Sequence, residues 1–170
     1  MSCACAALSV ADTGSTLILD GGEPLMNGLY LTAKAVETAV QRSEEHGVAT
    51  VVVRRSGHTG CLQAFLVRLS PPHPTSKGPA GLIRQPAAQE AATSQQCMVI
   101  IASSGPGVRS VAPYGGTTGT LHPNPFAVGI PATPVPILVD MSMGITANSN
   151  YRRAVDEGQR MPGRWVMTPE

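Results

Sequence analysis

The sequence predicts an α+β or mixed fold in which helices alternate with short strands. Three observations support this class. Apolar residues recur at helical spacing over residues 28–46, short β-branched runs occupy residues 48–53 and 98–102, and Gly- or Pro-rich turns separate these segments. A chain of 170 residues fits about one domain rather than two full ones.

The first half of the chain predicts two strands and two helices. Residues 17–19 read as a strand that enters an Asp-Gly-Gly turn, and residues 28–46 as a helix that ends at Gly47. One apolar face of that helix is expected to be buried, through Leu29, Ala33, Val36, Ala39 and Val40. Residues 48–53 are apolar on both faces and predict a buried strand, and residues 61–69 predict a second helix.

Residues 70–96 break this pattern. They hold five prolines, no aromatic residue and no sustained periodicity. Such a composition is typical of a linker or a disordered insertion. We therefore expect this segment to interrupt the domain.

The second half predicts three strands and a final helix. Residues 98–102 read as a buried strand, and residues 126–130 and 137–139 as two more. Asp140 ends the last strand, and residues 142–157 predict a helix that stops at Gly158. Long apolar helices are absent, and the order of the elements favours a mixed sheet.

Charge and cysteine usage argue against several classes of protein. Lys and Arg number 12 against 11 Asp and Glu, a balance that favours neither a nucleic-acid interface nor a membrane surface. Residues 1–10 lack the basic start of a signal peptide, and no apolar run reaches about 18 residues. The cysteines lack metal-ligand spacing, so we expect free thiols, no metal site and a cytoplasmic location.

Polar residues cluster where three predicted strands end, at residues 54–60, 103–107 and 140–144. Open sheets place ligands at such strand ends. Neither a Gly-x-Gly-x-x-Gly fingerprint nor a phosphate-binding P-loop occurs, so spacing alone does not name a cofactor.

Each polar cluster allows a functional and a structural interpretation. His58 suits proton transfer to an oxygen, or is an ordinary loop histidine. Asp140 holds a ribose hydroxyl or orients an imidazole, or caps a helix. Arg54 and Arg55 clamp a carboxylate, or are a solvated pair. Ser104 offers donors to a phosphate, or belongs to a simple turn.

Four motifs occur in a defined order along the chain. They are Arg-x-Ser-x-His-x-Gly at 54–60, Ala-Pro-Tyr-Gly-Gly at 112–116, Asn-Pro at 124–125 and Asp-Met-Ser at 140–142. Together they resemble the non-Rossmann malate/L-lactate dehydrogenase family, which also includes ureidoglycolate dehydrogenase, diketogulonate reductase and piperideine-carboxylate reductase. The resemblance covers roughly residues 10–69 and 97–167.

The resemblance implies a partial oxidoreductase domain over residues 10–167, interrupted at 70–96. Its expected fold is α+β, with a mixed, largely antiparallel sheet flanked by helices, in a homodimer that binds NAD or NADP. The implied reaction is hydride transfer between the nicotinamide and a small 2-hydroxy, 2-oxo or 2-imino acid such as malate or lactate.

The resemblance also assigns site residues by motif position. His58 falls on the active-site histidine, for proton exchange or cofactor contact. The cofactor-binding positions are Ser104, Asn124, Pro125, Asp140, Met141 and Ser142.

Three departures from the family pattern keep an alternative open. The chain lacks the Ser-His-Gly…Arg motif that supplies a catalytic histidine and a substrate arginine, and it lacks the later cofactor-binding loops. Relatives also join the helix after His58 directly to the next strand, without the proline-rich stretch 70–96. In addition, His122-Pro123 stands before Asn124, where relatives often have threonine. The alternative is a catalytically inactive fragment that binds a dinucleotide or a full-length homologue. A non-catalytic interaction module is disfavoured by the motifs.

Overall fold

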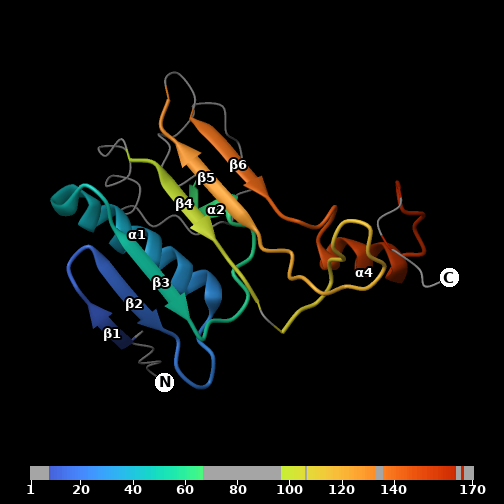
Figure 1. Cartoon of the computed structure of the whole chain (residues 1–170), viewed down its shortest axis with the longest axis horizontal. Helices are drawn as coiled ribbons and strands as arrows, with labels where there is room; N and C mark the ends of the chain where they lie inside the picture. Colours follow the sequence, from blue (N-terminus) through green and yellow to red (C-terminus); the bar gives the residue numbers. More distant parts are fainter. Residues whose placement is uncertain (1–7, 67–96, 106, 133–135, 164–165, 167–170) are drawn as a thin grey trace. The chain divides into compact units, whose positions relative to one another are not determined.

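The computed structural model describes residues 8–66, 97–105, 107–132, 136–163 and 166. Helices and strands are mixed along the chain, which confirms the predicted class (Figure 1). In order, the elements are β1 Leu8–Asp12, β2 Thr16–Asp20, α1 Gly28–His46, β3 Thr50–Arg54, α2 Gln63–Leu66, β4 Val99–Ala102, β5 Phe126–Ile130, β6 Ile137–Met141 and α4 Asn148–Asp156. The predicted insertion at 70–96 lies outside the described residues.

The strands form two open three-stranded sheets. In the first sheet, with the order β1-β2-β3, β1 is antiparallel to β2, and β2 is parallel to β3. The parallel register pairs Asp20 with Arg54, so the last residues of β2 and β3 lie side by side. Figure 1 shows the arrowheads of β2 and β3 at the same edge of this sheet.

The second sheet has the order β4-β5-β6. Figure 1 shows the arrow of β5 running against those of β4 and β6, so the sheet is antiparallel. β5 was predicted with the observed limits, whereas β6 continues through Asp140 to Met141. Asp140 is therefore a strand residue, and its interpretation as a helix cap is wrong.

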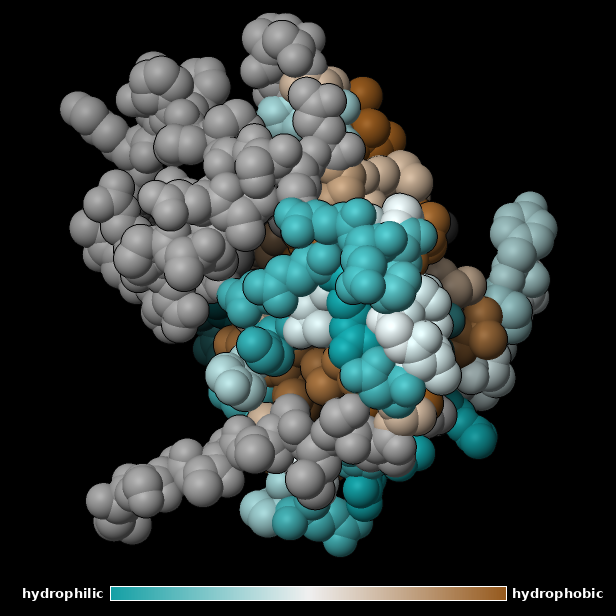
Figure 2. All heavy atoms as spheres, turned by 90° about the vertical axis from the view of Figure 1, so that its left-hand side faces the viewer, coloured by the Kyte–Doolittle hydropathy of each residue, from teal (hydrophilic) through white to brown (hydrophobic). Residues whose placement is uncertain are grey.

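Helix α1 starts and stops where local chemistry requires. The Asn27 side chain accepts hydrogen bonds from the amides of Leu29 and Tyr30, and Gly47 ends the helix with φ 74°. The far end of α1 carries the exposed residues Glu44, Glu45 and His46. Figure 2 shows hydrophilic atoms across the middle of the face on which α1 ends.

Helix α1 packs against two apolar clusters rather than one. Ala35 joins Leu17 and Leu19 of β2, whereas Ala33 and Val36 pack against the cluster of Leu62, Phe65, Leu66 and Ala127. Leu29, predicted to be buried, is 50% exposed, and Leu31 is fully buried instead. The helix is thus covered on two sides, which a single apolar stripe does not predict.

Strands β3 and β4 differ from their predicted burial. The side chains of β3 alternate, with Val51 and Val53 packed on the core and Val52 46% exposed. In β4, Val99 and Ile101 pack on the core and Ile100 is 56% exposed. Each sheet is therefore covered over one face of these strands, so their apolar sequences are not buried on both sides.

The final helix is shorter than predicted. It spans Asn148–Asp156 rather than 142–157. The residues before it form turns, because the amide of Met143 donates to the carbonyl of Pro123 at 2.7 Å and so leaves the helical pattern.

The chain divides into two compact units. Unit 1 comprises Met1–Ile101 and Ala127–Val139, and unit 2 comprises Ala102–Phe126 and Asp140–Glu170. Both apolar clusters belong to unit 1. None of the helices in the described part of the chain combines the length and apolarity needed to cross a bilayer.

Candidate functional site

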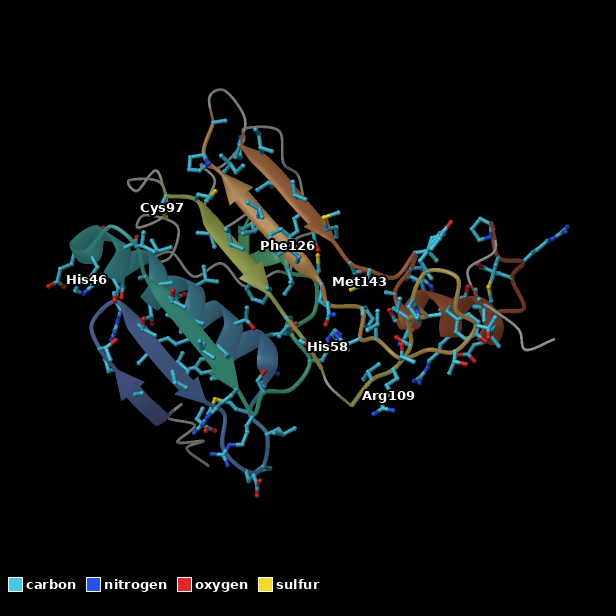
Figure 3. The ribbon with its side chains drawn as sticks, viewed as in Figure 1. His46, His58, Cys97, Arg109, Phe126 and Met143 are labelled. Atoms are coloured by element: carbon cyan, nitrogen blue, oxygen red, sulfur yellow. The ribbon has the colours of Figure 1, made fainter. Side chains whose placement is uncertain are left out.

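An open hollow of about 340 Å³ lies in unit 2, where the chain leaves β4 and enters β5. Phe126, the first residue of β5 and labelled in Figure 3, is one of its lining residues. The lining residues are Ala102, Ser103, Ser104, Asn124, Pro125 and Phe126. Three of the six predicted cofactor-binding residues, Ser104, Asn124 and Pro125, are therefore brought together.

Backbone hydrogen bonds hold the two sides of the hollow. The amide of Ser103 donates to the carbonyl of Pro125 at 3.0 Å, which joins the strand end to the Asn-Pro turn. Asn124 has a φ of 43°, in the left-handed region that asparagine tolerates better than most residues. This backbone conformation lets the Asn124 amide donate to His122 Nδ1 at 3.0 Å.

His122 supports the hollow through its contacts with Asn124 and Gly105, and it was not among the predicted site residues. Its Nδ1 accepts the Asn124 amide and also lies 3.3 Å from Asn124 Oδ1, and the other ring nitrogen is Nε2. A Cβ added at Gly105 would lie 2.9 Å from that Nε2, so the ring packs directly on the glycine backbone. Only the folded chain brings Gly105 to His122, and no local sequence pattern signals this contact.

The predicted Asp140–Ser142 segment is connected to the hollow through the next residue. Met143 donates its amide to Pro123, and the Asn124 side-chain nitrogen lies 3.5 Å from Met143 Sδ. Figure 3 shows Met143 after the end of β6. Asp140, Met141 and Ser142 are exposed and are not lining residues, so the structure places them next to the Asn-Pro turn rather than in the hollow.

His58 belongs to unit 1 and is exposed on the loop after β3 (Figure 3). The amide of Gly60 donates to its Nδ1 at 2.9 Å. The neutral ring therefore carries its proton on Nε2, where it can act as a hydrogen-bond donor. His58 is not a lining residue of the hollow in unit 2.

Arg54 and Arg55 are not a merely solvated pair. Their Nε atoms donate to the two carboxylate oxygens of Asp20 at 2.7 and 2.6 Å. The bond from Arg55, then those from the Gly22 amide and Arg54, hold the pKa of Asp20 well below its usual range. The described residues contain no group of three or more His, Cys, Asp or Glu side chains that could hold a metal ion.

The hollow combines the groups that small-ligand sites use. Two serines and an asparagine line it together with Pro125 and Phe126. Its volume is near the lower end of the roughly 300–1,000 Å³ range of ligand pockets. A hollow of this volume suits a small ligand or one part of a larger one.

Solved structures share this fold. The crystal structure of malate dehydrogenase from Entamoeba histolytica superposes with a TM-score of 0.67 at 22% identity, over 91% of this chain and 36% of that one. The chain belongs to the malate/L-lactate dehydrogenase family, which matches residues 84–170.

Two curated relatives match most of the chain. It is 26% identical to L-sulfolactate dehydrogenase of Methanothermobacter thermautotrophicus over 94% of its length, and 28% identical to malate dehydrogenase of Pyrococcus abyssi over 90%. The chain spans 39% of the first relative and 35% of the second.

Proposed function

We propose that the chain carries the nicotinamide-binding part of a 2-hydroxy acid dehydrogenase. NAD or NADP would bind in unit 2 beside the hollow, and the second substrate would be a small 2-hydroxy or 2-oxo acid such as malate, lactate or sulfolactate. The observation that carries the proposal is that Ser104, Asn124 and Pro125 line one hollow in a chain of this family.

The residues present suit part of a dinucleotide. Ser104 would hold it through the hydroxyl and Asn124 through the side-chain amide, while Pro125 and Phe126 offer apolar contact to a ring. The bound nicotinamide would accept or supply the hydride. Asp140, Met141 and Ser142 would extend this surface beyond the Asn-Pro turn, with the Asp140 carboxylate as a partner for a ribose hydroxyl.

His58 has a distinct place in the proposal. With Nδ1 occupied by the Gly60 amide, Nε2–H is the group that would reach a substrate or cofactor oxygen. A donor at this position would stabilise negative charge that develops on a carbonyl oxygen during hydride transfer. The proposal further includes a cytoplasmic homodimer and a partial domain over residues 10–167 that is interrupted at 70–96.

Fluorescence titration with NADH and NADPH tests the cofactor site. Asn124→Gly removes the amide while keeping a residue that tolerates φ 43°, so it should weaken binding about three- to tenfold. Ser104→Ala and Asp140→Ala should also weaken it. Ser149→Ala, an exposed serine on α4, is the matched control and should leave binding unchanged.

A turnover assay on the same protein distinguishes an active enzyme from a fragment that only binds the dinucleotide. Oxidation of the bound nicotinamide by oxaloacetate, pyruvate or sulfopyruvate, lost in His58→Ala, would support a complete reaction site. Binding without turnover would favour the dinucleotide-binding fragment. Equal affinity in Asn124→Gly, Ser104→Ala and the unsubstituted chain would remove the hollow from the cofactor site.

A further inference from the structure

The cluster of Asp20, Arg54 and Arg55 at the end of β2 and β3 has no part in the proposed cofactor site. All three residues belong to unit 1. Asp20 is 2% exposed, while the Arg54 and Arg55 side chains are 52% and 51% exposed. A buried carboxylate thus holds two arginines whose outer parts face solvent.

The backbone makes both arginines converge on one carboxylate. Side chains of consecutive residues in an extended strand point to opposite faces. Arg54 is the last residue of β3, and Arg55 follows with a φ of 50°, in the left-handed region, so the alternation stops there. Both side chains then reach Asp20 through Nε.

The neighbouring glycine holds this conformation in place. The amide of Gly21 donates to the Arg54 carbonyl at 3.0 Å. A Cβ added at Gly21 would meet the carbonyl oxygen of Arg55 at 2.1 Å, so no other residue fits this approach. An uncommon backbone conformation fixed by its surroundings is a recurrent feature of ligand-binding sites.

Both guanidinium groups keep most of their donors. Each arginine has five N–H donors, and the bond to Asp20 uses only the one on Nε. Among the described residues, neither Nη group of Arg54 or Arg55 has a hydrogen-bond partner. The inner edge of each planar group is therefore fixed, and the outer edge remains available.

The charge is not balanced within the cluster. The Asp20 carboxylate neutralises one of the two guanidinium groups, so one positive charge is left over. The exposed Glu23 carboxylate, which attracts Arg55, offsets part of this charge. A carboxylate has two oxygens, which one guanidinium fork satisfies. A tetrahedral oxyanion offers a third oxygen and a second charge, which suits two forks.

We propose that Arg54 and Arg55, anchored by Asp20, form a binding site for the phosphate group of a small soluble molecule. Asp20 positions the arginines, and their Nη groups contact the phosphate oxygens. This inference stands apart from the proposed dehydrogenase function, because it uses residues of unit 1 alone.

Calorimetric titration of the whole chain with inorganic phosphate tests the site, at ionic strength held constant with sodium chloride. Arg54→Gln and Arg55→Gln should each reduce the affinity about tenfold, since each removes a charge-assisted fork. Lys34→Gln removes an equal charge from an exposed position on α1 and should change the affinity less than about twofold.

Two further variants keep the test decisive if a glutamine variant does not fold. The double variant Arg54→Lys and Arg55→Lys keeps both charges without the forks and should lose most of the phosphate binding. Glu23→Gln removes the competing carboxylate and should tighten binding about two- to fivefold. Acetate should bind at least about tenfold more weakly than phosphate to the unsubstituted chain.

Several results would overturn the proposal. They are the absence of phosphate binding to the unsubstituted chain, equal losses in Lys34→Gln and Arg55→Gln, full binding in the double lysine variant, and acetate binding as tight as phosphate binding. NADH titration of the same variants separates the two proposals, because loss of phosphate binding with intact NADH binding concerns this site alone.

Discussion

At the scale of single residues, Gly105 and Gly107 provide a test of how the hollow is held. A Cβ at Gly105 would approach His122 Nε2 to 2.9 Å, whereas a Cβ at Gly107 would meet nothing within 4 Å. Gly105→Ala should therefore displace the ring and lengthen its bond to the Asn124 amide. Overpacking of this kind costs about 1–3 kcal/mol. We expect a melting temperature lower by a few degrees and several-fold weaker NADH binding.

Gly107→Ala is the control for this experiment, since it adds the same methyl group to open space. It should leave the melting temperature and NADH binding unchanged. If Gly105→Ala behaves like Gly107→Ala in both measurements, the contact between His122 and Gly105 has no role in shaping the hollow.

The structure brings together three of the candidate site residues that have local sequence signals, and their role stays a prediction. Ser104, Asn124 and Pro125 stand in short motifs next to predicted strands, and the structure brings them to one hollow. His122 was missed because its role depends on the distant Gly105 backbone. The link between Arg55 and Asp20 was missed for a similar reason, because a positive φ at an arginine has no sequence signature.

At the scale of elements, one ion pair fastens β1 to α1. Arg42 of α1 contacts both carboxylate oxygens of Asp12 at 2.6 Å and also reaches the Gly14 carbonyl. The hydrogen bond from Arg42 and that from the Gly14 amide lower the pKa of Asp12 from 3.8 to about 2. Because the folded pKa lies below the unfolded one, the stabilisation is complete above about pH 4 and is lost as the pH falls toward 2.

Asp12→Asn should accordingly lower the melting temperature at pH 6 and have a smaller effect at pH 2.5. Circular dichroism melts at several pH values measure this difference. Glu44→Gln changes an exposed carboxylate on α1 and should give no such dependence. A constant difference between Asp12→Asn and the unsubstituted chain across this range would contradict the ion-pair argument.

The limits of an element could be predicted where the contacts that stabilise it come from neighbouring residues, and could not where they come from distant segments. Helix α1 was predicted with its observed ends because Asn27 and Gly47 act within their own turns. Strand β1 was not predicted, since its five residues pair with β2 and carry little pattern of their own. The last helix was predicted too long, because the bond from Met143 to Pro123 comes from another part of unit 2.

At the scale of the whole molecule, apolar burial is unequal between the units. Of the buried apolar residues in the described part of the chain, Ala154 alone belongs to unit 2. Unit 1 contains the two apolar clusters and the pairing of β1, β2 and β3. Local opening requires little free energy where few apolar contacts are lost, so the units should differ in stability.

Hydrogen–deuterium exchange of the whole chain, followed by mass spectrometry, measures this difference. Peptides from β2 and α1 should exchange slowest, and peptides from α4 and residues 107–121 should exchange orders of magnitude faster, because hydrogen exchange reports the free energy of local opening. If the cofactor binds as proposed, saturating NADPH should slow exchange at residues 102–105 and 122–126, with little change in β2. Equal exchange of α4 and α1 without ligand would mean that unit 2 is stabilised by contacts other than apolar burial. Protection by NADPH confined to β2 and β3 would instead place the dinucleotide in unit 1.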